Sequence, residues 1–314
     1  MRIVSAAEIG QILSYPALID ALDEAFRADV AAPPRHVHTI ASEGAVDAKL
    51  ELTPAWTNAS NCLVGCKLAS VFPDNATRGK PAVHAVYLLM SGDTGEPLGL
   101  FDGVPLTLWR TACASALASR YLARDDAEHL VMVGAGALAP HLIRAHRTVR
   151  PIRRVTLWNR TRSRAVATAF ALSASGIAVE IADDLEAAVR DADVVSCATL
   201  AVKPLLQGTW LKKGAHVDLV GSLLPASREA DDQAIRRARV YVDARANAAK
   251  GSGDIAIPLR KKVLRLKDIQ GDLFELCRGK RKGRKRKDEI TLFKSVGSAL
   301  EDLAAAMLVW RGLK

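Results

Sequence analysis

The feature that most constrains the fold is a glycine-rich turn between an apolar segment and a helical one. Residues 129–133, HLVMV, are followed by GAGALA at 134–139. In a strand–turn–helix unit, the first glycine permits a tight bend and the second lets the backbone approach a pyrophosphate. A small third residue lets the helix pack closely on the strand. A second apolar strand follows at 154–158, so we predict a dinucleotide site, with a turn used only for packing as the alternative.

The end of that second strand predicts which dinucleotide is bound. Enzymes that use NAD usually carry Asp or Glu about twenty residues after the glycines, where the carboxylate binds the ribose 2′-hydroxyl. This chain has Trp158-Asn159-Arg160-Thr161 there, followed by Arg162 and Arg164, and no carboxylate. A guanidinium can pair with a 2′-phosphate through two hydrogen bonds. The sequence therefore favours NADPH over NADH, and a solvated basic turn is the alternative.

The segment around this turn alternates between strand and helix patterns. Segments of helical periodicity separate most of the predicted strands, which is typical of βαβ units and a parallel sheet. We predict a Rossmann-type domain over 121–289. The predicted strands are HLVMVGA (129–135), RVTLWNR (154–160), VEIAD (179–183), DVVSCAT (193–199), AHVDLVGS (215–222) and ARVYVDA (238–244).

The N-terminal part has a different pattern. Apolar residues recur at helical spacing over 4–30, and alternating runs separated by turn residues over 36–104 predict an antiparallel meander. Its clearest strands are 67–72, 82–90 and 96–103, and a helix rich in small residues follows at 106–123. We expect 290–312 to be a final amphipathic helix that returns to this part. The fold class is thus α/β, with a discontinuous α+β domain formed by 1–120 and 290–314.

The charge of the chain is concentrated in one segment. The net charge is +10, and residues 260–287 contain thirteen Lys/Arg and three Asp/Glu, so the rest of the chain is neutral. The run GKRKGRKRK at 279–287 could bind nucleic acid through phosphates. It has no interleaved aromatic residues on which bases would stack, so we favour a solvated loop.

Cysteine and histidine spacing and overall hydropathy give three further expectations. The five cysteines and seven histidines match no zinc pattern, so we expect no metal, and we expect Cys62 and Cys66 to be reduced. No segment approaches the roughly 20 apolar residues that span a bilayer. The first residues lack the features of a signal peptide, so we expect a cytoplasmic protein.

Ordered sequence blocks along nearly the whole chain resemble the ornithine cyclodeaminase/mu-crystallin family. The resemblance implies homodimers in which the first domain supplies the dimer interface and much of the substrate site. The blocks are KLASVFPDN (67–75), GKPAVHA (79–85), DTGEPLGLFDG (93–103), LTLWRTACASALASRYLA (106–123), GAGALA (134–139), WNRT (158–161), VGSLLPASREAD (220–231) and ITLFKSVGSALEDLAAA (290–306).

The resemblance also implies a site for the carboxylate of a small imino, keto or amino acid. The basic residues that match are Arg35, Lys67 and Arg110. A carboxylate removed from water needs charge-assisted donors, and Arg110 has apolar neighbours. Lys67 lies in an apolar stretch, where an unpaired ammonium is costly, so we expect a ligand to be its partner. A plain loop arginine is the alternative for Arg35.

Further matched positions bear on the cofactor. The residues that the resemblance assigns to cofactor binding are Thr111, Gly134, Gly136, Ala137, Leu138, Asn159, Arg160, Thr161, Thr199, Val220, Gly221, Ser222 and Ser295.

One departure from the family's pattern narrows the chemistry. Ornithine cyclodeaminases have an aspartate where this chain has Leu223, and that aspartate activates water. Leucine cannot accept a proton, which disfavours ornithine cyclisation. Leu138 also replaces a common glutamine. The resemblance is closer to the ketimine reductases, and it implies reduction of Δ1-pyrroline-2-carboxylate to proline or of Δ1-piperideine-2-carboxylate to pipecolate.

The family also leaves alternatives open. They are reductive amination of a 2-oxo acid, as in alanine dehydrogenase-like or opine-forming members, ornithine cyclisation, and a non-enzymatic binding protein like mu-crystallin. Within the reductase hypothesis, Lys67 either stabilises the substrate carboxylate or donates a proton to the imine nitrogen. The ring size of the substrate stays open.

Overall fold

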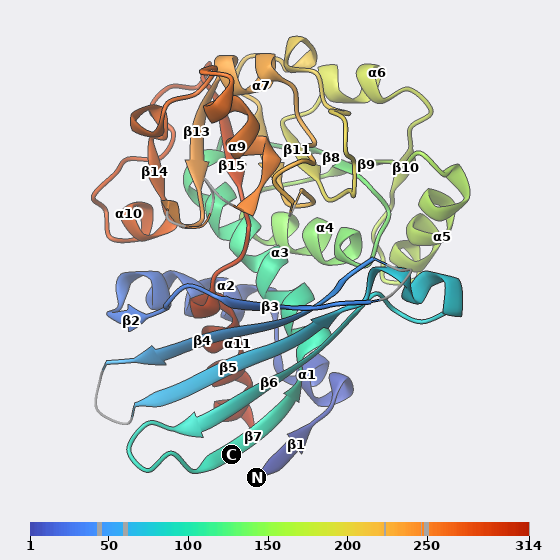
Figure 1. Ribbon diagram of the computed structural model, residues 1–314. Helices are drawn as coiled ribbons and strands as arrows, with labels where there is room; N and C mark the ends of the chain where they lie inside the picture. Colours follow the sequence, from blue (N-terminus) through green and yellow to red (C-terminus); the bar gives the residue numbers. More distant parts are fainter. Residues whose placement is uncertain (43–45, 59–61, 223, 246, 248–250, 314) are drawn as a thin grey trace. The chain divides into compact units, whose positions relative to one another are not determined.

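A computed structural model of the chain describes residues 1–42, 46–58, 62–222, 224–245, 247 and 251–313 (Figure 1). The chain divides into two compact units. The first unit comprises Met1–Thr111 and Ser298–Lys314, and the second comprises Ala112–Gly297. The first part of the chain is therefore a discontinuous unit, with the second unit inserted into it.

The first unit contains a mixed sheet. Consecutive strands from β4 to β7 pair antiparallel, as the alternating pattern predicts, and β1 adds to β7 in parallel. The strands are β1 (Arg2–Val4), β2 (Val30–Ala31), β3 (His36–Ile40), β4 (Ala48–Thr57), β5 (Leu63–Val71), β6 (Val83–Ser91) and β7 (Pro97–Asp102).

Helices cover one face of this sheet. The helices are α1 (Ala6–Ile12), α2 (Tyr15–Arg27), the first part of α3 (Gly103–Leu122) and α11 (Ala299–Gly312), with a 3-10 turn at Pro73–Arg78. Helix α11 packs on α2 and on β4, β5 and β6, and Figure 1 shows it behind these strands. Because side chains alternate between the faces of a strand, Ala55, Tyr87 and Leu89 are buried while their sequence neighbours face outward.

Strand β4 is long, but it is not among the clearest strands that the sequence predicts. It contains Pro54, which cannot donate a ladder hydrogen bond. Strand β3 pairs with β4 at Ala48–Leu52, and β2 pairs with it only at Trp56 and Thr57. Pro54 therefore lies in the gap between β2 and β3, on the side of β4 where no ladder partner is lost.

The second unit has the predicted parallel sheet, in the order β10-β9-β8-β11-β12-β15-β13-β14. The chain starts at β8, builds outward to β10, and then continues on the other side of β8 with β11. The switch point lies between β8 and β11, where parallel sheets bind ligands at the carboxyl ends of their strands. The strands are β8 (His129–Val133), β9 (Arg154–Trp158), β10 (Glu180–Ile181), β11 (Val194–Cys197), β12 (His216–Leu219), β13 (Ala238–Val242), β14 (Gly271–Asp272) and β15 (Ile290–Lys294).

Helices connect most of these strands, and a 3-10 turn lies between β11 and β12, so that β9, β10, β11 and β12 are each reached from the preceding strand by a parallel crossover. The helices of the second unit, besides the end of α3, are α4 (Leu138–Val149), α5 (Arg162–Ser173), α6 (Leu185–Arg190), α7 (Asp232–Arg237), α9 (Gly253–Arg260) and α10 (Leu273–Cys277), with 3-10 turns at Gly208–Trp210 and Leu266–Asp268.

The prediction of one helix over 290–312 is wrong in its first part. Residues Ile290–Lys294 form β15, which is buried between β12 and β13. This segment is rich in β-branched and aromatic residues, which favour a strand over a helix. Ser298 then caps α11, because its side chain accepts a hydrogen bond from the Leu300 N–H. The chain consequently returns to the first unit at Ser298, and the unit boundaries differ from the predicted 120 and 290.

The basic run at 279–287 is only partly a solvated loop. Arg284 is half-buried, and its guanidinium donates to the carbonyl oxygens of Leu122 (2.8 Å) and Ala215 (3.2 Å). It also donates to the Thr291 hydroxyl at 3.1 Å. Arg284 thus ties the end of α3 to the starts of β12 and β15, whereas Arg286 and Lys287 are exposed.

The described residues also bear on disulfides, metal sites and membrane spans. The five cysteines are free, as expected for Cys62 and Cys66. Among the described residues, no cluster of three or more His, Cys, Asp or Glu side chains is arranged to hold a metal ion. No described helix is long and apolar enough to cross a membrane.

Candidate active site

A buried cluster of charges lies in the first unit where β5, α3 and α11 meet. Lys67 comes from β5 and Arg110 from α3, and only 14% and 8% of their side-chain surfaces are exposed. The structure therefore brings together two of the three basic residues predicted to bind a carboxylate. Lys67 faces α11 because it shares the buried face of β5 with Gly65 and Ala69.

Two carboxylates that the sequence patterns did not single out hold these cations. Asp302 accepts from Lys67 Nζ at 2.6 Å and from Arg110 Nε at 3.0 Å. Glu301 accepts from Arg110 Nη1 at 2.7 Å. Lys67 thus has a partner within the same unit, so a ligand is not needed to compensate its charge, and the expectation of a ligand partner stays a prediction. An ammonium and a guanidinium offer more N–H donors than these bonds engage, so the cluster can still accept a ligand carboxylate.

Burial and the close charges shift the pKa values of this cluster. Burial lowers the pKa of Lys67, and Asp302 only partly opposes that shift. Burial alone would raise the pKa of Asp302, but Arg110 and Lys67 outweigh it and hold the pKa below its usual value. Arg110 is kept charged, because Asp302 and Glu301 outweigh the effect of burial and raise its pKa. The cluster is therefore an ionic network, in which Lys67 is the cation that loses its proton more readily.

Arg35 lies at the edge of this region. It follows the prolines between β2 and β3, its side chain is 43% exposed, and its Nη1 is 3.5 Å from Glu51 Oε2. It is close enough to Lys67 for its charge to contribute to the lowered pKa of that ammonium. The structure thus places Arg35 within electrostatic range of the cluster, on an exposed side chain rather than inside the buried network.

The glycine turn of the second unit has the geometry of a phosphate-binding turn. Gly134 has a φ of +107°, and a Cβ there would lie 2.6 Å from the Ala198 carbonyl oxygen. Gly136 is exposed, and a Cβ there would meet no atom within 4 Å. Gly134 is therefore needed for the bend, while Gly136 leaves its backbone open to a ligand. Helix α4 begins directly after Ala137, and no side chain caps its N-terminus.

The end of β9 supports this turn and presents a guanidinium. The Asn159 side chain accepts from the Ala135 N–H at 3.2 Å and donates to the Thr161 carbonyl at 2.8 Å. Arg160 is exposed, whereas its neighbour Arg162 is paired with Asp183. Thr161 precedes α5, whose N-terminus it does not cap with its side chain. The end of β9 therefore presents an exposed guanidinium, and no carboxylate, beside the glycine turn.

On the other side of the switch point, the ends of β11 and β12 are joined by a buried carboxylate. Glu229 accepts from the Thr199 N–H at 2.7 Å and hydroxyl at 2.8 Å, and from the Gly221 N–H at 2.7 Å. A Cβ on Gly221 would lie about 2.1 Å from the Thr199 carbonyl oxygen, so only glycine allows this approach. Thr199 and Gly221 are predicted cofactor residues, whereas Glu229 was not singled out.

The remaining predicted cofactor residues occupy different surroundings. The Val220 N–H donates to Cys197 and the Ser295 N–H to Leu219, so both follow strand ends. The Ser222 hydroxyl is buried and donates to the Ser227 carbonyl oxygen. Thr111 lies in α3 at the end of the first unit and is also buried. Leu138 is the first residue of α4, and Leu223 lies outside the described residues.

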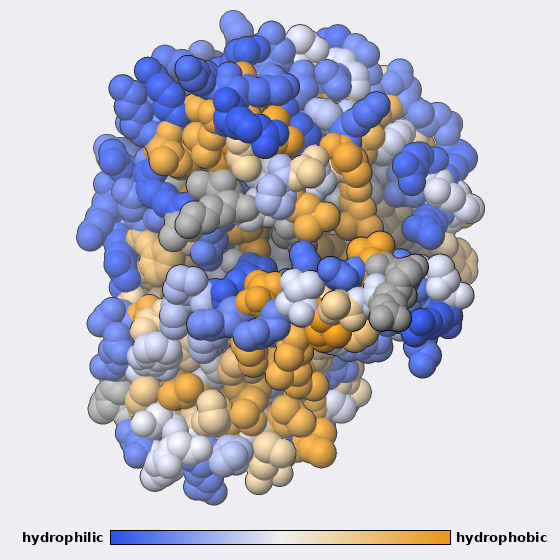
Figure 2. Space-filling view, viewed as in Figure 1, coloured by the Kyte–Doolittle hydropathy of each residue, from blue (hydrophilic) through white to orange (hydrophobic). Residues whose placement is uncertain are grey.

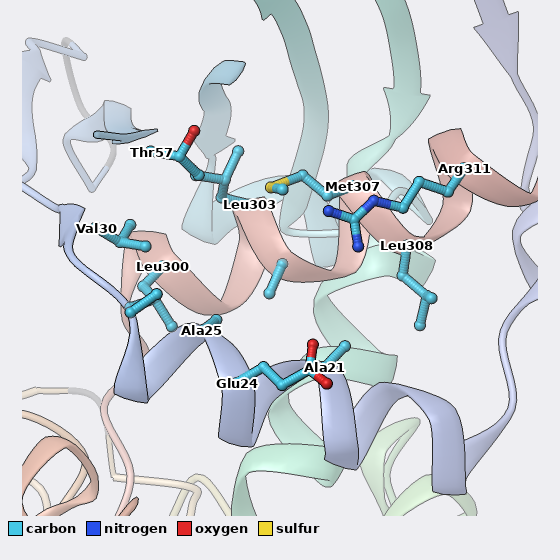
Figure 3. Close-up of a pocket in the computed structure, with 12 residues that line it drawn as sticks. Ala21, Glu24, Ala25, Val30, Thr57, Leu300, Leu303, Met307, Leu308 and Arg311 are labelled. Atoms are coloured by element: carbon cyan, nitrogen blue, oxygen red, sulfur yellow. The ribbon is translucent and has the colours of Figure 1, made fainter. Parts of the chain in front are cut away.

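A separate apolar pocket lies between α2 and α11. It has a volume of about 170 Å³, and Figure 3 shows that its lining comes from these two helices, with Val30 and Thr57 at one side. Neither Lys67 nor Arg110 lines it. The charged cluster, and not this pocket, therefore carries the chemistry expected of a site for small acids.

Known proteins share this chain's sequence and fold. The Δ1-pyrroline-2-carboxylate reductase of Colwellia psychrerythraea is 37% identical, over 98% of this chain and 97% of that protein. The same reductase from Thermococcus litoralis, solved with NADH and L-proline, superposes with a TM-score of 0.93 and 30% identity, over 99% and 97% of the chains. An archaeal alanine dehydrogenase dimer with bound NAD superposes with a TM-score of 0.91 and 28% identity, over 99% and 95%.

The family assignment rests on the entire chain. Residues 1–314 match the ornithine cyclodeaminase/mu-crystallin family, which agrees with the resemblance of the ordered sequence blocks. The parallel sheet with its glycine turn and the discontinuous first unit agree with the fold of the solved relatives. The chain belongs to the ornithine cyclodeaminase/mu-crystallin family.

Proposed function

We infer that this protein is an NAD(P)H-dependent oxidoreductase acting on C=N bonds, and we propose that it reduces a cyclic ketimine carboxylate. The substrates we propose are Δ1-pyrroline-2-carboxylate, giving L-proline, and Δ1-piperideine-2-carboxylate, giving L-pipecolate. Support comes from the similarity to proteins named Δ1-pyrroline-2-carboxylate reductase and from a solved relative that contains NADH and L-proline. The bound cofactor would supply the hydride to the C=N carbon.

The observation that carries this proposal is the buried network of Lys67, Arg110, Asp302 and Glu301. Two fixed cations in a largely water-excluded place suit a substrate carboxylate, because charge-assisted hydrogen bonds strengthen there. The carboxylates fix the positions of the cations before any substrate binds, which reduces the cost of ordering them. Lys67, with its lowered pKa, is the candidate proton donor to the imine nitrogen.

For the cofactor, we propose a preference for NADPH over NADH. The exposed Arg160 and the absence of Asp or Glu from the Trp158–Thr161 segment support it. The solved relatives named above contain NADH or NAD, and NADH is therefore the alternative cofactor. An exposed arginine can take a 2′-phosphate without leaving a buried charge unpaired when NADH binds instead.

We also propose that the protein forms homodimers through the outward face of the sheet in the first unit. Leu52, Leu68 and Val86 are aligned across β4, β5 and β6, and Leu68 and Val86 are 41% and 38% exposed. Figure 2 shows apolar side chains gathered over these strands. A contiguous apolar surface of this kind is typical of a protein interface. The similarity to an alanine dehydrogenase dimer supports this proposal.

A second candidate function is reductive amination of a 2-oxo acid. The similarity to an alanine dehydrogenase favours it, and the charged cluster would suit pyruvate as well as a cyclic imine. Ornithine cyclisation has less support, since Leu223 cannot activate water. A purely binding role is disfavoured by the intact charged network.

A steady-state assay of cofactor oxidation distinguishes these functions. Both cyclic imines are compared with pyruvate plus ammonia, using NADPH and NADH in turn, and L-ornithine is tested for ammonia release. We expect the highest kcat/KM for a cyclic imine with NADPH. A higher kcat/KM for pyruvate plus ammonia would replace the proposal with the second candidate. Binding of NADPH without oxidation across all substrates would support a binding protein.

A further inference from the structure

We propose that Glu229 is a positioning residue that builds the nicotinamide half of the cofactor site, by joining the ends of β11 and β12. This inference rests on the proposed function only in assuming that a nicotinamide dinucleotide binds the second unit. The adenosine half is assigned to the glycine turn and the end of β9. A dinucleotide bound across the switch point must then extend toward β11 and β12, where Thr199 and Gly221 lie.

The hydrogen bonds of Glu229 show how it acts. One carboxylate oxygen, Oε1, accepts from both donors of Thr199, and the other, Oε2, accepts from the Gly221 N–H. Each donor belongs to the first residues after a strand, and the strands are neighbours in the sheet. Beyond the last paired residues of β11 and β12, the Glu229 carboxylate therefore replaces the hydrogen bonds of the sheet. It fixes the separation of the two strand ends at the edge of the sheet where ligands bind.

Burial and a hydrogen bond of its backbone fix the position of Glu229. Its side chain is fully buried, and its N–H donates to Asp254 Oδ1 at 2.8 Å. Lys294 Nζ, also fully buried, lies 3.6 Å from Asp254 Oδ2, so a cation balances part of the negative charge. A buried carboxylate without hydrogen-bonding partners would be costly, but here every oxygen of Glu229 has a donor. Burial nevertheless raises the pKa of Glu229 to about 7, because the charged carboxylate is less stable here than in water.

The substitution Glu229→Gln tests this role with little change of shape. An amide has one acceptor oxygen and one NH₂ group, so either Thr199 or Gly221 must face a donor instead of an acceptor. In either orientation of the amide, the end of β11 or the end of β12 therefore loses its hydrogen bond to residue 229. Asp231→Asn is the control for the change from carboxylate to amide alone, because one oxygen of Asp231, Oδ1, accepts both the Gly208 and the Ala234 N–H bonds (2.8 Å each) at the start of α7, and an amide oxygen can keep both.

The readout is the affinity for the whole dinucleotide compared with that for its adenosine fragment. Calorimetric titration is done with NADPH and 2′,5′-ADP, or with NADH and ADP if NADH is preferred. We expect Glu229→Gln to weaken dinucleotide binding by about tenfold or more while fragment binding changes less than about twofold. Thr199→Val, which removes one of the donors, should give a smaller loss of the same kind. Asp231→Asn should leave the ratio of the two affinities unchanged.

The outcomes separate this inference from the proposed function. If the unmutated protein binds neither dinucleotide, the proposed function fails before any variant is measured. If the unmutated protein binds the dinucleotide, two results refute the positioning role of Glu229 and leave the proposed function standing. In the first, Glu229→Gln weakens the affinities for dinucleotide and fragment equally. In the second, it weakens neither affinity. Melting temperatures of the three variants, measured without ligand, show whether the compared proteins are folded at the temperature of titration.

Discussion

Asp302 on α11 and Lys67 on β5 form an ion pair of 2.6 Å although they are 235 residues apart in the sequence. The same carboxylate accepts from Arg110 Nε, so it joins the three elements that surround the cluster. Helix α11 therefore supplies a carboxylate that favours the charged form of the lysine to which we assign substrate binding or proton donation, against the larger effect of burial.

The first prediction concerns the substitution Asp302→Asn. Burial already lowers the pKa of Lys67 and Asp302 opposes the shift, so loss of this carboxylate lowers that pKa further. We expect the loss of kcat/KM at high pH to begin at a lower pH than in the unmutated enzyme. Glu301→Gln is the control, because Glu301 contacts Arg110 instead. A pH profile that moves equally in both variants would contradict the assignment of Lys67.

The second prediction concerns Arg110→Ala. It leaves Glu301 and part of Asp302 without a buried counter-charge, and breaking a buried pair in this way costs about 3–5 kcal/mol of stability. We also expect kcat/KM on either imine to fall by roughly a hundredfold, because charge-assisted bonds to the substrate carboxylate are lost. Urea unfolding and steady-state kinetics measure the two effects. Near-normal kcat/KM in a folded variant would remove Arg110 from the site.

The third prediction concerns the choice of cofactor. Arg160→Glu places a carboxylate where NAD enzymes usually have one, so it should repel the 2′-phosphate and favour NADH. We expect the KM for NADPH to rise by about ten- to a hundredfold, as for the loss of a charged hydrogen-bond partner. Arg153→Glu, an exposed change just before the start of the same strand, is the control. A preference of the unmutated protein for NADH would refute the role of Arg160.

The fourth prediction separates the roles of two glycines. Gly136→Ala has room for its Cβ, so we expect unchanged stability but weaker dinucleotide binding, since the methyl group would occupy the space open to the pyrophosphate. Gly134→Ala should instead lower the melting temperature, because of its positive φ and the clash with the Ala198 carbonyl. Thermal unfolding and titration with the dinucleotide distinguish the two. Equal losses of stability in both variants would contradict this division.

The fifth prediction concerns stability against acid. Burial lowers the pKa of His216 to about 3, against the ordinary 6.5 in the unfolded chain. Between these values the unfolded state binds more protons, so the contribution of neutral His216 is complete above pH 6.5 and is lost as the pH falls toward 3. We expect His216→Gln to lose less free energy of unfolding between pH 7.5 and pH 5 than the unmutated protein. Parallel losses would contradict it. The raised pKa of Glu229 acts in the opposite direction, but it is common to both proteins.

The fold was predictable where one local pattern decides it. The glycine turn and the alternation of strands and helices predicted the parallel sheet and its central strands, and the alternating N-terminal runs predicted the antiparallel sheet. The strand at Ile290–Lys294 was missed, because it directly precedes a helical segment, although its β-branched and aromatic residues favour a strand and it pairs with β12 and β13. The strand β4 was obscured by Pro54, which is tolerated only because of its particular neighbours.

The site was predictable only in part, for a related reason. Lys67 and Arg110 stood out as cations among apolar residues. Their partners Glu301 and Asp302 also lie in an apolar run, and this was the signal available in the sequence. However, Ser298-x-x-Glu301 is also the pattern of a capping box, in which the glutamate would bond back to the helix start. The spatial meeting of α3, β5 and α11 decides between these roles, and no local pattern encodes it.

The central claim is that hydride passes from a nicotinamide cofactor to the imine carbon of a cyclic carboxylate. Its most direct test is incubation of Δ1-pyrroline-2-carboxylate with NADPH deuterated at C4, on each face in turn, followed by mass spectrometry of the product. We predict proline carrying one deuterium at Cα with one of the two labelled cofactors, and a much smaller amount of this labelled proline in the same time when Lys67→Ala replaces the unmutated enzyme. Unlabelled proline with both cofactors, or no proline at all, would contradict the account.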